Sequence, residues 1–360
     1  MPQSAKTPST PPTSPAAPVP QPPAGPLPEA VHRTVEVPGG RIHLVEQGSG
    51  PLVLMVHGFP ESWYSWRHQL PALAAAGYRA VAIDVRGYGR SSKPRDVAAY
   101  RMLAHVADNV AVVRALGEET AIIVGHDWGS PIAANTALLR PDVFTAVALL
   151  SVPYAPRGGI RPTEAFARLG GGGEFYINYF QEPGRAEAEI EPAVRDWIAG
   201  FYVVASGDAK QDATRSDAAQ DHVGHFSVAP GGKLSDRFPE KLPLPLPWLT
   251  EADLDFYAGE FERTGLTGGL NRYRNIDRDW EDLAAWDGAP LRQPSLFIGG
   301  EHDAPTNWMA DAIKAFPHTL PGLSASHILD GCGHWVQQER PEEVNRLLTD
   351  WLGSLPGAAA

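Results

Sequence analysis

The chain is poor in cysteine, in positive charge and in long apolar segments. Cys332 is the single cysteine in 360 residues, which excludes an internal disulfide and is typical of a reducing compartment; we therefore expect a cytoplasmic protein. A formal net charge of -12 argues against nucleic acid and anionic membrane surfaces as partners. No stretch approaches the roughly 20 apolar residues of a membrane span.

Sequence signatures of bound cofactors are missing as well. Clustered metal-ligand spacing is absent, and no Gly-rich phosphate-binding P-loop is found. No internal repeat is apparent. We therefore expect no metal and no organic cofactor.

Proline, by contrast, is abundant in the first segment, MPQSAKTPSTPPTSPAAPVPQPPAGPLPEA. Because proline fixes φ and removes a hydrogen-bond donor, this segment cannot form the interior of a helix or a sheet. It also lacks the basic start and the continuous apolar core of a secretory signal. We expect residues 1–30 to form a disordered and dispensable tail.

Strand and helix patterns alternate from residue 31 to about residue 154. A hairpin is predicted in HRTVEVPGGRIHLVEQG, followed by buried strands in PLVLMVHGFP, YRAVAIDVRGYGRSS, AIIV and AVALLSVP. Helices are expected in WRHQLPALAAAG, in MLAHVADNVAVVRALG and from about Trp128. This alternation indicates an α/β fold with a mostly parallel central sheet flanked by helices.

The alternation is interrupted by a segment of different composition. Helix-like pieces such as EAEIEPAVRDWIAGFYVV and EADLDFYAGEFERTG flank a polar, Pro-rich stretch from about residue 206 to 247. The strand–helix rhythm returns with SLFIGGEHD, a helix near NWMADAIKAF, SHILDGCGHW and PEEVNRLLTDWL. We predict a core of residues 31–154 and 291–356, with a mainly helical lid at residues 155–290 between its strands.

The most informative motif is Gly-His-Asp-Trp-Gly, which joins a predicted strand to a predicted helix. It is similar to the G-x-S-x-G nucleophile elbow of the α/β-hydrolases, with Asp127 at the serine position. Gly125 and Gly129 permit a tight turn, and the dipole of the following helix favours a carboxylate. The alternative interpretation is that Asp127 only caps the helix, since aspartate is a good N-cap.

Other motifs follow predicted strands in the order expected of a catalytic triad. HGFP occupies the place where an α/β-hydrolase supplies an oxyanion donor, so the backbone N–H groups of Phe59 and Trp128 are predicted to form an oxyanion hole. Asp303 and His334 come later, each after a strand. Either Glu301 or Asp303 could orient His334, and the motif favours Asp303.

A carboxylate at the elbow indicates a particular chemistry. Serine attack on a saturated carbon would give an ether, which water does not readily cleave, whereas a carboxylate gives an alkyl ester. Histidine-activated water can then attack the carbonyl carbon of this ester. Asp127 therefore predicts displacement at an sp³ carbon bearing oxygen or halogen, and argues against an esterase, lipase or peptidase.

Several longer motifs are shared with one known family: HGFPESWYSWRHQ, DVRGYGRSSKP, GHDWGS, FYINYFQEPGRAEAEIE, LNRYRNIDRDW and GCGHWVQQERPEEVNRLL. On these motifs, from about Val31 to Leu355, the chain resembles the soluble epoxide hydrolases of the α/β-hydrolase fold. This resemblance implies Asp127 as the nucleophile, His334 as the base and Asp303 as the acid that orients the base.

The resemblance also implies that Tyr176 and Tyr273 of the lid hydrogen-bond the epoxide oxygen, and that a cis peptide precedes Pro60. A phenol with a pKa near 10 can donate a proton to an opening epoxide. The alternative is that both tyrosines only pack the lid. We expect Trp128, Phe59 and Pro60 to contact the substrate.

Several other chemically interesting residues have plainer interpretations. His57 and His126 adjoin glycines at strand ends and are interpreted as structural. Cys332 is interpreted as a small buried residue, because a nucleophile and its base usually meet across the fold. Trp63 and Trp66 either line the pocket or pack the core, and the sequence leaves both options open.

Two other functions stay open beside epoxide hydrolysis. A dehalogenase would use the same aspartate, but it would need donors for halide, and Phe59 has no polar side chain to offer. A non-catalytic, ligand-binding hydrolase scaffold is the other alternative, against which the intact triad argues. The expected partners are a small epoxide and water; a homodimer is an open hypothesis.

Overall fold

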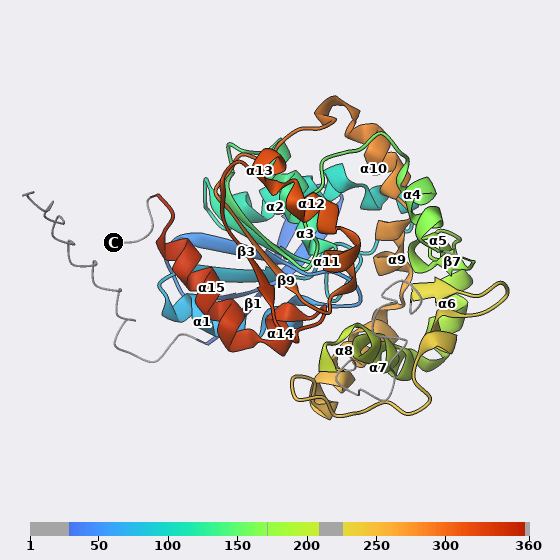
Figure 1. Cartoon of the computed structure of the whole chain (residues 1–360). Coiled ribbons are helices and arrows are strands. Elements are labelled where there is room, and N and C mark those ends of the chain that lie inside the picture. The colour runs from blue at the N-terminus through green and yellow to red at the C-terminus, as the bar shows by residue number, and fades with distance from the viewer. Residues whose placement is uncertain (1–28, 171, 209–225, 357–360) are drawn as a thin grey trace, which may run out of the picture.

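A computed structural model describes residues 29–170, 172–208 and 226–356. Most of the predicted tail, and residues 209–225 of the predicted Pro-rich stretch, lie outside these residues. The described chain is organised by an eight-stranded sheet in the order β1-β2-β4-β3-β5-β6-β9-β10 (Figure 1). The strands are β1 (Val31–Val37), β2 (Gly40–Gln47), β3 (Leu52–Val56), β4 (Arg79–Ile83), β5 (Ala121–His126), β6 (Phe144–Leu150), β9 (Ser295–Gly300) and β10 (Leu323–Leu329).

The pairing of the strands confirms the predicted, mostly parallel sheet. β1 and β2 form an antiparallel hairpin, and β2 also runs antiparallel to β4. All pairs from β4 to β10 are parallel. Every residue of β3 and β5 is buried, as expected of continuous apolar strands covered on both faces.

Helices cover both faces of the sheet. On one face, α2 (Met102–Ala115) and α3 (Gly129–Leu139) pack on side chains such as Leu54 of β3. On the other face, α1 (Gln69–Ala75) and α15 (Pro341–Gly353) pack on side chains such as Val53. Alternate residues of one strand thus enter different cores, which follows from the two-residue period of a strand.

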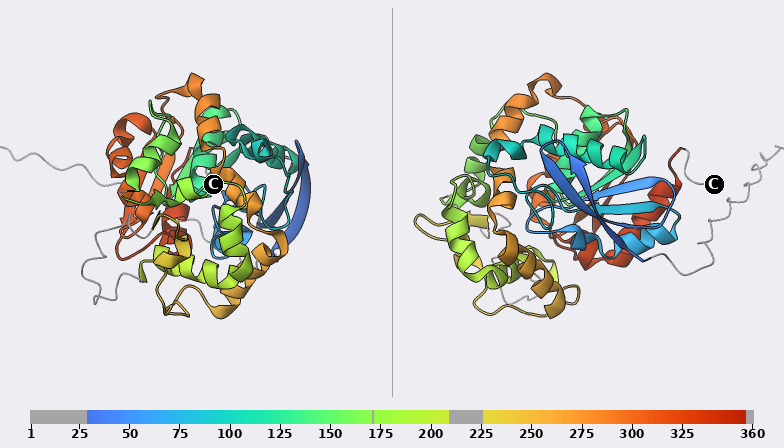
Figure 2. Two further views of the ribbon diagram at one scale, coloured as in Figure 1. Left: turned by 90° about the vertical axis from the view of Figure 1, so that its right-hand side faces the viewer. Right: turned by 180° about the vertical axis from the view of Figure 1, so that it is seen from behind.

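The chain between β6 and β9 is mainly helical and lies beyond one end of the strands (Figures 1 and 2). Small strands β7 (Glu174–Phe175) and β8 (Ser227–Val228) pair within it. The boundaries predicted for the lid stay predictions. The helices of this insertion are α4 (Pro162–Leu169), α5 (Tyr176–Tyr179), α6 (Arg185–Ile190), α7 (Val194–Ala205), α8 (Glu251–Thr264), α9 (Thr267–Tyr273) and α10 (Ile276–Asp282).

Two helical segments are more broken than the sequence predicts. The continuous piece expected around residues 187–204 is split into α6 and α7 by a 3-10 turn at Glu191–Ala193, because Pro192 cannot donate a helical hydrogen bond. The helix expected near residues 307–316 is replaced by α11 (Ala304–Trp308), α12 (Ala310–Lys314) and α13 (Phe316–Thr319). Prolines in the first turns of α11 and α13 favour new helix starts there.

Within the described residues, no helix combines the length and the apolar character required to cross a membrane.

Candidate active site

Asp127 lies in the sharp turn between β5 and α3, with φ at 51°. This left-handed conformation is unusual for a residue with a side chain and is typical of strained functional turns. The neighbouring glycines are required by space: a Cβ at Gly125 would lie 2.0 Å from the Gly129 carbonyl oxygen, and one at Gly129 would lie 1.9 Å from that of Val56. The turn therefore presents the Asp127 side chain at the end of the sheet.

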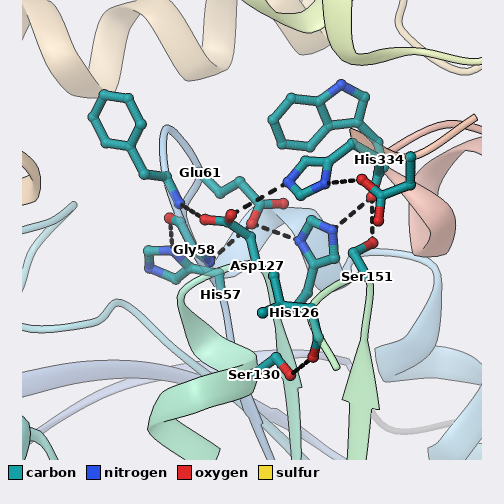
Figure 3. A network of polar contacts seen from close by, with 12 residues as sticks. His57, Gly58, Glu61, His126, Asp127, Ser130, Ser151 and His334 are labelled. Atoms are coloured by element: carbon teal, nitrogen blue, oxygen red, sulfur yellow. Dashed lines mark hydrogen bonds and ion pairs between the residues drawn. The ribbon is translucent and has the colours of Figure 1, made fainter. Parts of the chain in front are cut away.

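The carboxylate of Asp127 does not cap the following helix. The N-cap residue of α3 is Trp128, and Asp127 Oδ1 instead accepts a hydrogen bond of 2.7 Å from the backbone N–H of Phe59 (Figure 3). Phe59 follows β3 and precedes a cis peptide bond to Pro60, as the family resemblance implies. The loop after β3 thus reaches across to the turn after β5.

His334 links the elbow to the loops after β9 and β10. Its Nε2 lies 3.3 Å from Asp127 Oδ2, and its Nδ1 lies 2.7 Å from Asp303 Oδ1. The other oxygen of Asp303 accepts from the Thr306 hydroxyl at 2.6 Å, which fixes the carboxylate. Glu301, the alternative partner, accepts from the backbone N–H of Gly331 instead. The three predicted triad residues therefore meet in space, and Asp303 is the one that contacts His334.

The surroundings of His334 favour its protonated form. Burial disfavours the charged imidazole, but the negative charges and hydrogen bonds of Asp303 and Asp127 outweigh burial and raise the pKa of His334 well above its usual value. Neutralising Asp127 would remove part of this effect. The proton affinity of His334 is therefore coupled to the charge on Asp127.

A second layer of polar contacts supports the triad. Glu61 belongs to this layer, and the sequence analysis gave it no role. The buried Glu61 carboxylate accepts from the Gly58 N–H and from His126 Nδ1, both at 2.8 Å (Figure 3). His126 Nε2 donates to the backbone carbonyl of His334 at 2.8 Å, and the Ser151 hydroxyl donates to the same carbonyl at 2.6 Å.

Glu61 and His126 form a buried pair in this layer. The two ring nitrogens of His126 contact the Glu61 carboxylate and the His334 backbone carbonyl, so the imidazole pairs with Glu61. Burial alone would favour the neutral acid, but the charge and hydrogen bond of His126 lower the pKa of Glu61 to about 2. His57 lies nearby and bonds to the Gly58 carbonyl and the Val85 N–H. The pair of Glu61 and His126 connects the loop of Phe59 to the loop of His334, beneath the reacting atoms.

Tyr176 of α5 and Tyr273 of α9 approach the triad from the insertion. Their ring centroids are 6.1 Å apart, and both side chains are buried. Burial, with the nearby charge of Asp127, raises the pKa of Tyr176 far above its usual value, and burial raises that of Tyr273 likewise. Both phenols are therefore protonated hydrogen-bond donors at neutral pH.

These side chains line one narrow cavity between the core and the insertion. Its walls are mostly aromatic and apolar, and sequence reasoning did not identify Trp308, although it lies five residues after Asp303. The lining residues are Phe59, Asp127, Tyr176, Phe201, Ala205, Phe226, Tyr273, Ala304, Pro305, Trp308 and His334.

Other predicted residues lie outside the cavity lining. Trp128 and Pro60 do not line it; the indole of Trp128 packs perpendicular to the ring of Tyr273, with centroids 5.1 Å apart. Trp66 is fully buried in the core, and Trp63 packs against that core. Cys332 is a buried free cysteine.

Across the part of the chain that the structure describes, no group of three or more His, Cys, Asp or Glu side chains could hold a metal ion.

Comparisons with known proteins agree with this geometry. Residues 51–183 match the family model described as alpha/beta hydrolase fold. Epoxide hydrolase B of Mycobacterium tuberculosis is 47% identical over 90% of this chain and 99% of its own length. The crystal structure of epoxide hydrolase A from Mycobacterium thermoresistibile is 44% identical, with a TM-score of 0.83 over 91% of this chain and 99% of that one.

A solved epoxide hydrolase from an endophytic Streptomyces is more similar still. It is 74% identical and superposes with a TM-score of 0.85 over 90% of this chain and 95% of that chain. Such identity over nearly the whole length includes the core and the helical insertion. The chain therefore belongs to the epoxide hydrolase family of the α/β-hydrolase fold.

Proposed function

We propose that the chain hydrolyses epoxides to vicinal diols through a covalent alkyl ester on Asp127. One observation carries the proposal: Asp127 Oδ1 is held by a backbone N–H and Oδ2 faces His334, in a cavity that two phenols also line. A nucleophile, a base and two proton donors thus share one site. The names of the relatives support the same reaction class.

In the first step, Asp127 Oδ2 attacks a ring carbon of the epoxide and forms an ester bond. The ring C–O bond breaks, and its electron pair stays on the epoxide oxygen. Tyr176 and Tyr273 donate hydrogen bonds to this oxygen, and one of them transfers its proton. Two fixed donors at the developing alkoxide stabilise the transition state.

In the second step, His334 Nε2 takes a proton from water, and the water oxygen attacks the ester carbonyl carbon of Asp127. The N–H groups of Phe59 and Trp128 stabilise the negative oxygen of the tetrahedral intermediate. The ester C–O bond then breaks, and the leaving diol oxygen takes the proton from His334. Asp127 loses the remaining acid proton and the tyrosine regains one, so the net change is addition of one water.

The coupling between His334 and Asp127 suits this order of steps. Esterification removes the negative charge of Asp127, which is one of the charges that raise the pKa of His334. His334 therefore gives up its proton more readily in the ester state than in the free enzyme. The base becomes available when the second step needs it.

The cavity walls favour neutral, apolar epoxides. Apart from Asp127 and His334, the residues that line the cavity are uncharged, and most of them are aromatic or aliphatic. A carboxylate buried against such walls would lose its hydration without gaining a partner. The substrate class that fits is a compact epoxide with an apolar substituent.

The test of the mechanism uses His334→Gln, with the exposed His318→Gln as the matched control. His334→Gln should allow the first displacement and block ester hydrolysis, so mass spectrometry should find one substrate bound to the Asp127 peptide. His318→Gln should show no adduct at the end of turnover. In a single wild-type turnover in heavy-oxygen water, the label should enter the Asp127 carboxylate; label found only in the diol would mean direct attack by water.

The dehalogenase alternative predicts a different product from the same experiment. Halide leaves without a proton, so a dehalogenase has no need of two phenols above its nucleophile. Release of halide from haloalkanes, with no diol from any epoxide, would replace the proposed reaction.

We also place the protein in the cytoplasm, which its single cysteine supports, and keep the homodimer as a hypothesis for sedimentation experiments.

A further inference from the structure

The loop that carries His334 is held to the insertion through its backbone. The His334 N–H donates to the carbonyl of Ala205, the last residue of α7, at 2.8 Å. Two residues further on, the backbone of Gly207 packs against that of Gly333: a Cβ on Gly333 would lie 2.2 Å from the Gly207 nitrogen. We call these two facing segments, residues 205–207 and 333–335, the seam.

One carboxylate bridges the seam. Glu339, at the end of the short helix α14 (Val336–Glu339), folds back so that Oε2 accepts from the N–H groups of Gly207 at 3.0 Å and Gly333 at 2.9 Å. Its Oε1 accepts from the Trp335 N–H at 3.0 Å. The residues on both sides of His334 and the end of the insertion's helix α7 therefore converge on a single side chain.

The Glu339 carboxylate is held by backbone dipoles without a cation. Its side chain is buried, and among the described residues no salt bridge reaches it. Burial outweighs the three N–H donors and raises the pKa of Glu339 to about 7. An ionisable group buried without a countercharge destabilises a fold, so its presence beside the catalytic histidine calls for a function.

We propose that Glu339 is a positioning residue that sets the place of His334 for ester hydrolysis and ties it to the docked insertion. The proposal rests on the function proposed above, because it assigns Glu339 to the second step of that reaction. Glu339 touches neither substrate nor reacting atoms; it acts through the backbone on either side of His334. The same carboxylate that orders this loop also orders the end of α7.

The two chemical steps depend on this placement to different degrees. Attack of Asp127 on the epoxide needs the phenols and the carboxylate, which the seam does not hold. Activation of water needs His334 Nε2 to lie at a defined distance from the ester carbonyl. Displacement by about 1 Å in such a site lowers a rate by about 100-fold. Loss of the bridge should therefore slow hydrolysis much more than alkylation.

Glu339→Gln tests this with the least change in shape. The amide offers one oxygen and an NH₂ group, so at least one of the three N–H donors loses its acceptor. Rapid mixing should show alkylation within about threefold of wild type and ester hydrolysis slower by about 10- to 100-fold. The alkyl-enzyme should therefore accumulate during turnover. Glu343→Gln, an exposed carboxylate on α15, is the control and should leave both rates unchanged.

A second variant approaches the seam from the insertion. A Cβ at Gly207 would lie 2.3 Å from the Gly331 carbonyl oxygen, so Gly207→Ala should separate the two segments without altering Glu339. We expect the same accumulation of alkyl-enzyme. If both variants slow alkylation and ester hydrolysis equally, so that the ratio of the two rates stays as in wild type, Glu339 is only structural and the proposal is wrong.

A measurement on the wild-type protein does not depend on any variant folding. Amide hydrogen exchange of peptides that contain Gly207, Gly333 and Trp335 should be slow, and should be slowed further to a similar extent when a stable alkyl-enzyme forms. Fast exchange at these amides would overturn the bridge. If wild-type protein forms no ester on Asp127, the proposed function is wrong. If the ester forms and turns over normally, but both variants keep the wild-type ratio of alkylation rate to hydrolysis rate, only the role of Glu339 is wrong.

Discussion

At the scale of single residues, the site is governed by how each carboxylate is compensated. Asp127 accepts a hydrogen bond from a backbone N–H and faces the His334 imidazole, Glu61 pairs with His126, and Glu339 has backbone N–H donors only. These surroundings act in opposite directions on two of the acids: His126 lowers the pKa of Glu61 to about 2, whereas burial raises the pKa of Glu339 to about 7.

The pair of Asp303 and His334 gives a pH-dependent prediction. Protonated His334 cannot act as a base, so ester hydrolysis should fall as the pH drops through the pKa of His334 in the alkyl-enzyme. Asp303 raises that pKa, so Asp303→Asn should move the fall to lower pH. It should also reduce the plateau rate by about 10³- to 10⁴-fold, as the loss of an orienting aspartate does in other triads.

This prediction is checked by following the decay of a preformed alkyl-enzyme at a series of pH values. Wild-type protein and Asp303→Asn are compared under single-turnover conditions. Glu301→Gln, whose carboxylate bonds to the Gly331 N–H, serves as the control and should keep the wild-type profile. If the rate of ester hydrolysis falls at a higher pH in Asp303→Asn than in wild type, the assignment of Asp303 as the acid that orients His334 is wrong.

At the scale of elements, the helix that carries Tyr273 is anchored to the core by a buried ion pair. Arg272, on α9, bonds to Asp279 of α10 and donates to the Tyr100 carbonyl at 2.5 Å. Asp279 in turn accepts from the Met102 N–H, at the start of α2, at 2.6 Å. Burial lowers the pKa of Arg272 to about 9, which leaves the guanidinium charged at neutral pH.

We predict that Asp279→Ala lowers both stability and the rate of the first chemical step. The variant leaves the Arg272 cation buried and unpaired, which should reduce the free energy of unfolding by about 3–5 kcal/mol. It also releases the helix that positions Tyr273, so alkylation of Asp127 should slow about as much as in Tyr273→Phe, by about 10- to 100-fold. Urea unfolding and rapid-mixing fluorescence measure the two effects.

The matched control removes an exposed carboxylate that also pairs with arginine. Asp350 lies 3.4 Å from Arg346 with both side chains largely exposed, so Asp350→Ala should change the free energy of unfolding by less than about 1 kcal/mol. Alkylation in Asp350→Ala should equal that of wild type. If Asp279→Ala loses stability but alkylates at the normal rate, α9 does not depend on this ion pair to place Tyr273.

At the scale of the whole molecule, the negative net charge and the mostly apolar cavity both disfavour anionic substrates. The formal net charge of -12 repels anions in solution, and among the described residues the cavity is lined by no lysine or arginine. Neutral epoxides meet neither barrier. Long-range repulsion is screened by salt, whereas the desolvation of a carboxylate inside the cavity is not.

We therefore predict that an epoxy acid is a poorer substrate than its methyl ester by about tenfold or more in kcat/KM, equivalent to about 1.4 kcal/mol. Raising the ionic strength should reduce the difference in kcat/KM between acid and ester without abolishing it, because the desolvation cost inside the cavity remains. The experiment compares kcat/KM for both compounds at low and high salt. Equal turnover of acid and ester would mean that a cation reaches the bound substrate.

The sequence by itself determined the features that depend on local pattern. The two-residue period and apolar runs predicted the strands, and the glycines around Asp127 predicted the elbow. The order of Asp127, Asp303 and His334 predicted a triad whose members the structure brings together. The break at Pro192 lies inside a segment whose pattern is otherwise helical, so the sequence predicted one continuous helix there.

Only the tertiary structure decided which distant groups compensate one another. Glu61 and His126 are 65 residues apart, and Glu339 and Gly207 are 132 apart, so no local period links them. The aromatic wall at Trp308 likewise depends on how the insertion docks over the strand ends. A buried polar group takes whichever partner the packed chain brings within about 3 Å, and that distance is fixed by long-range packing, which residue spacing along the chain does not encode.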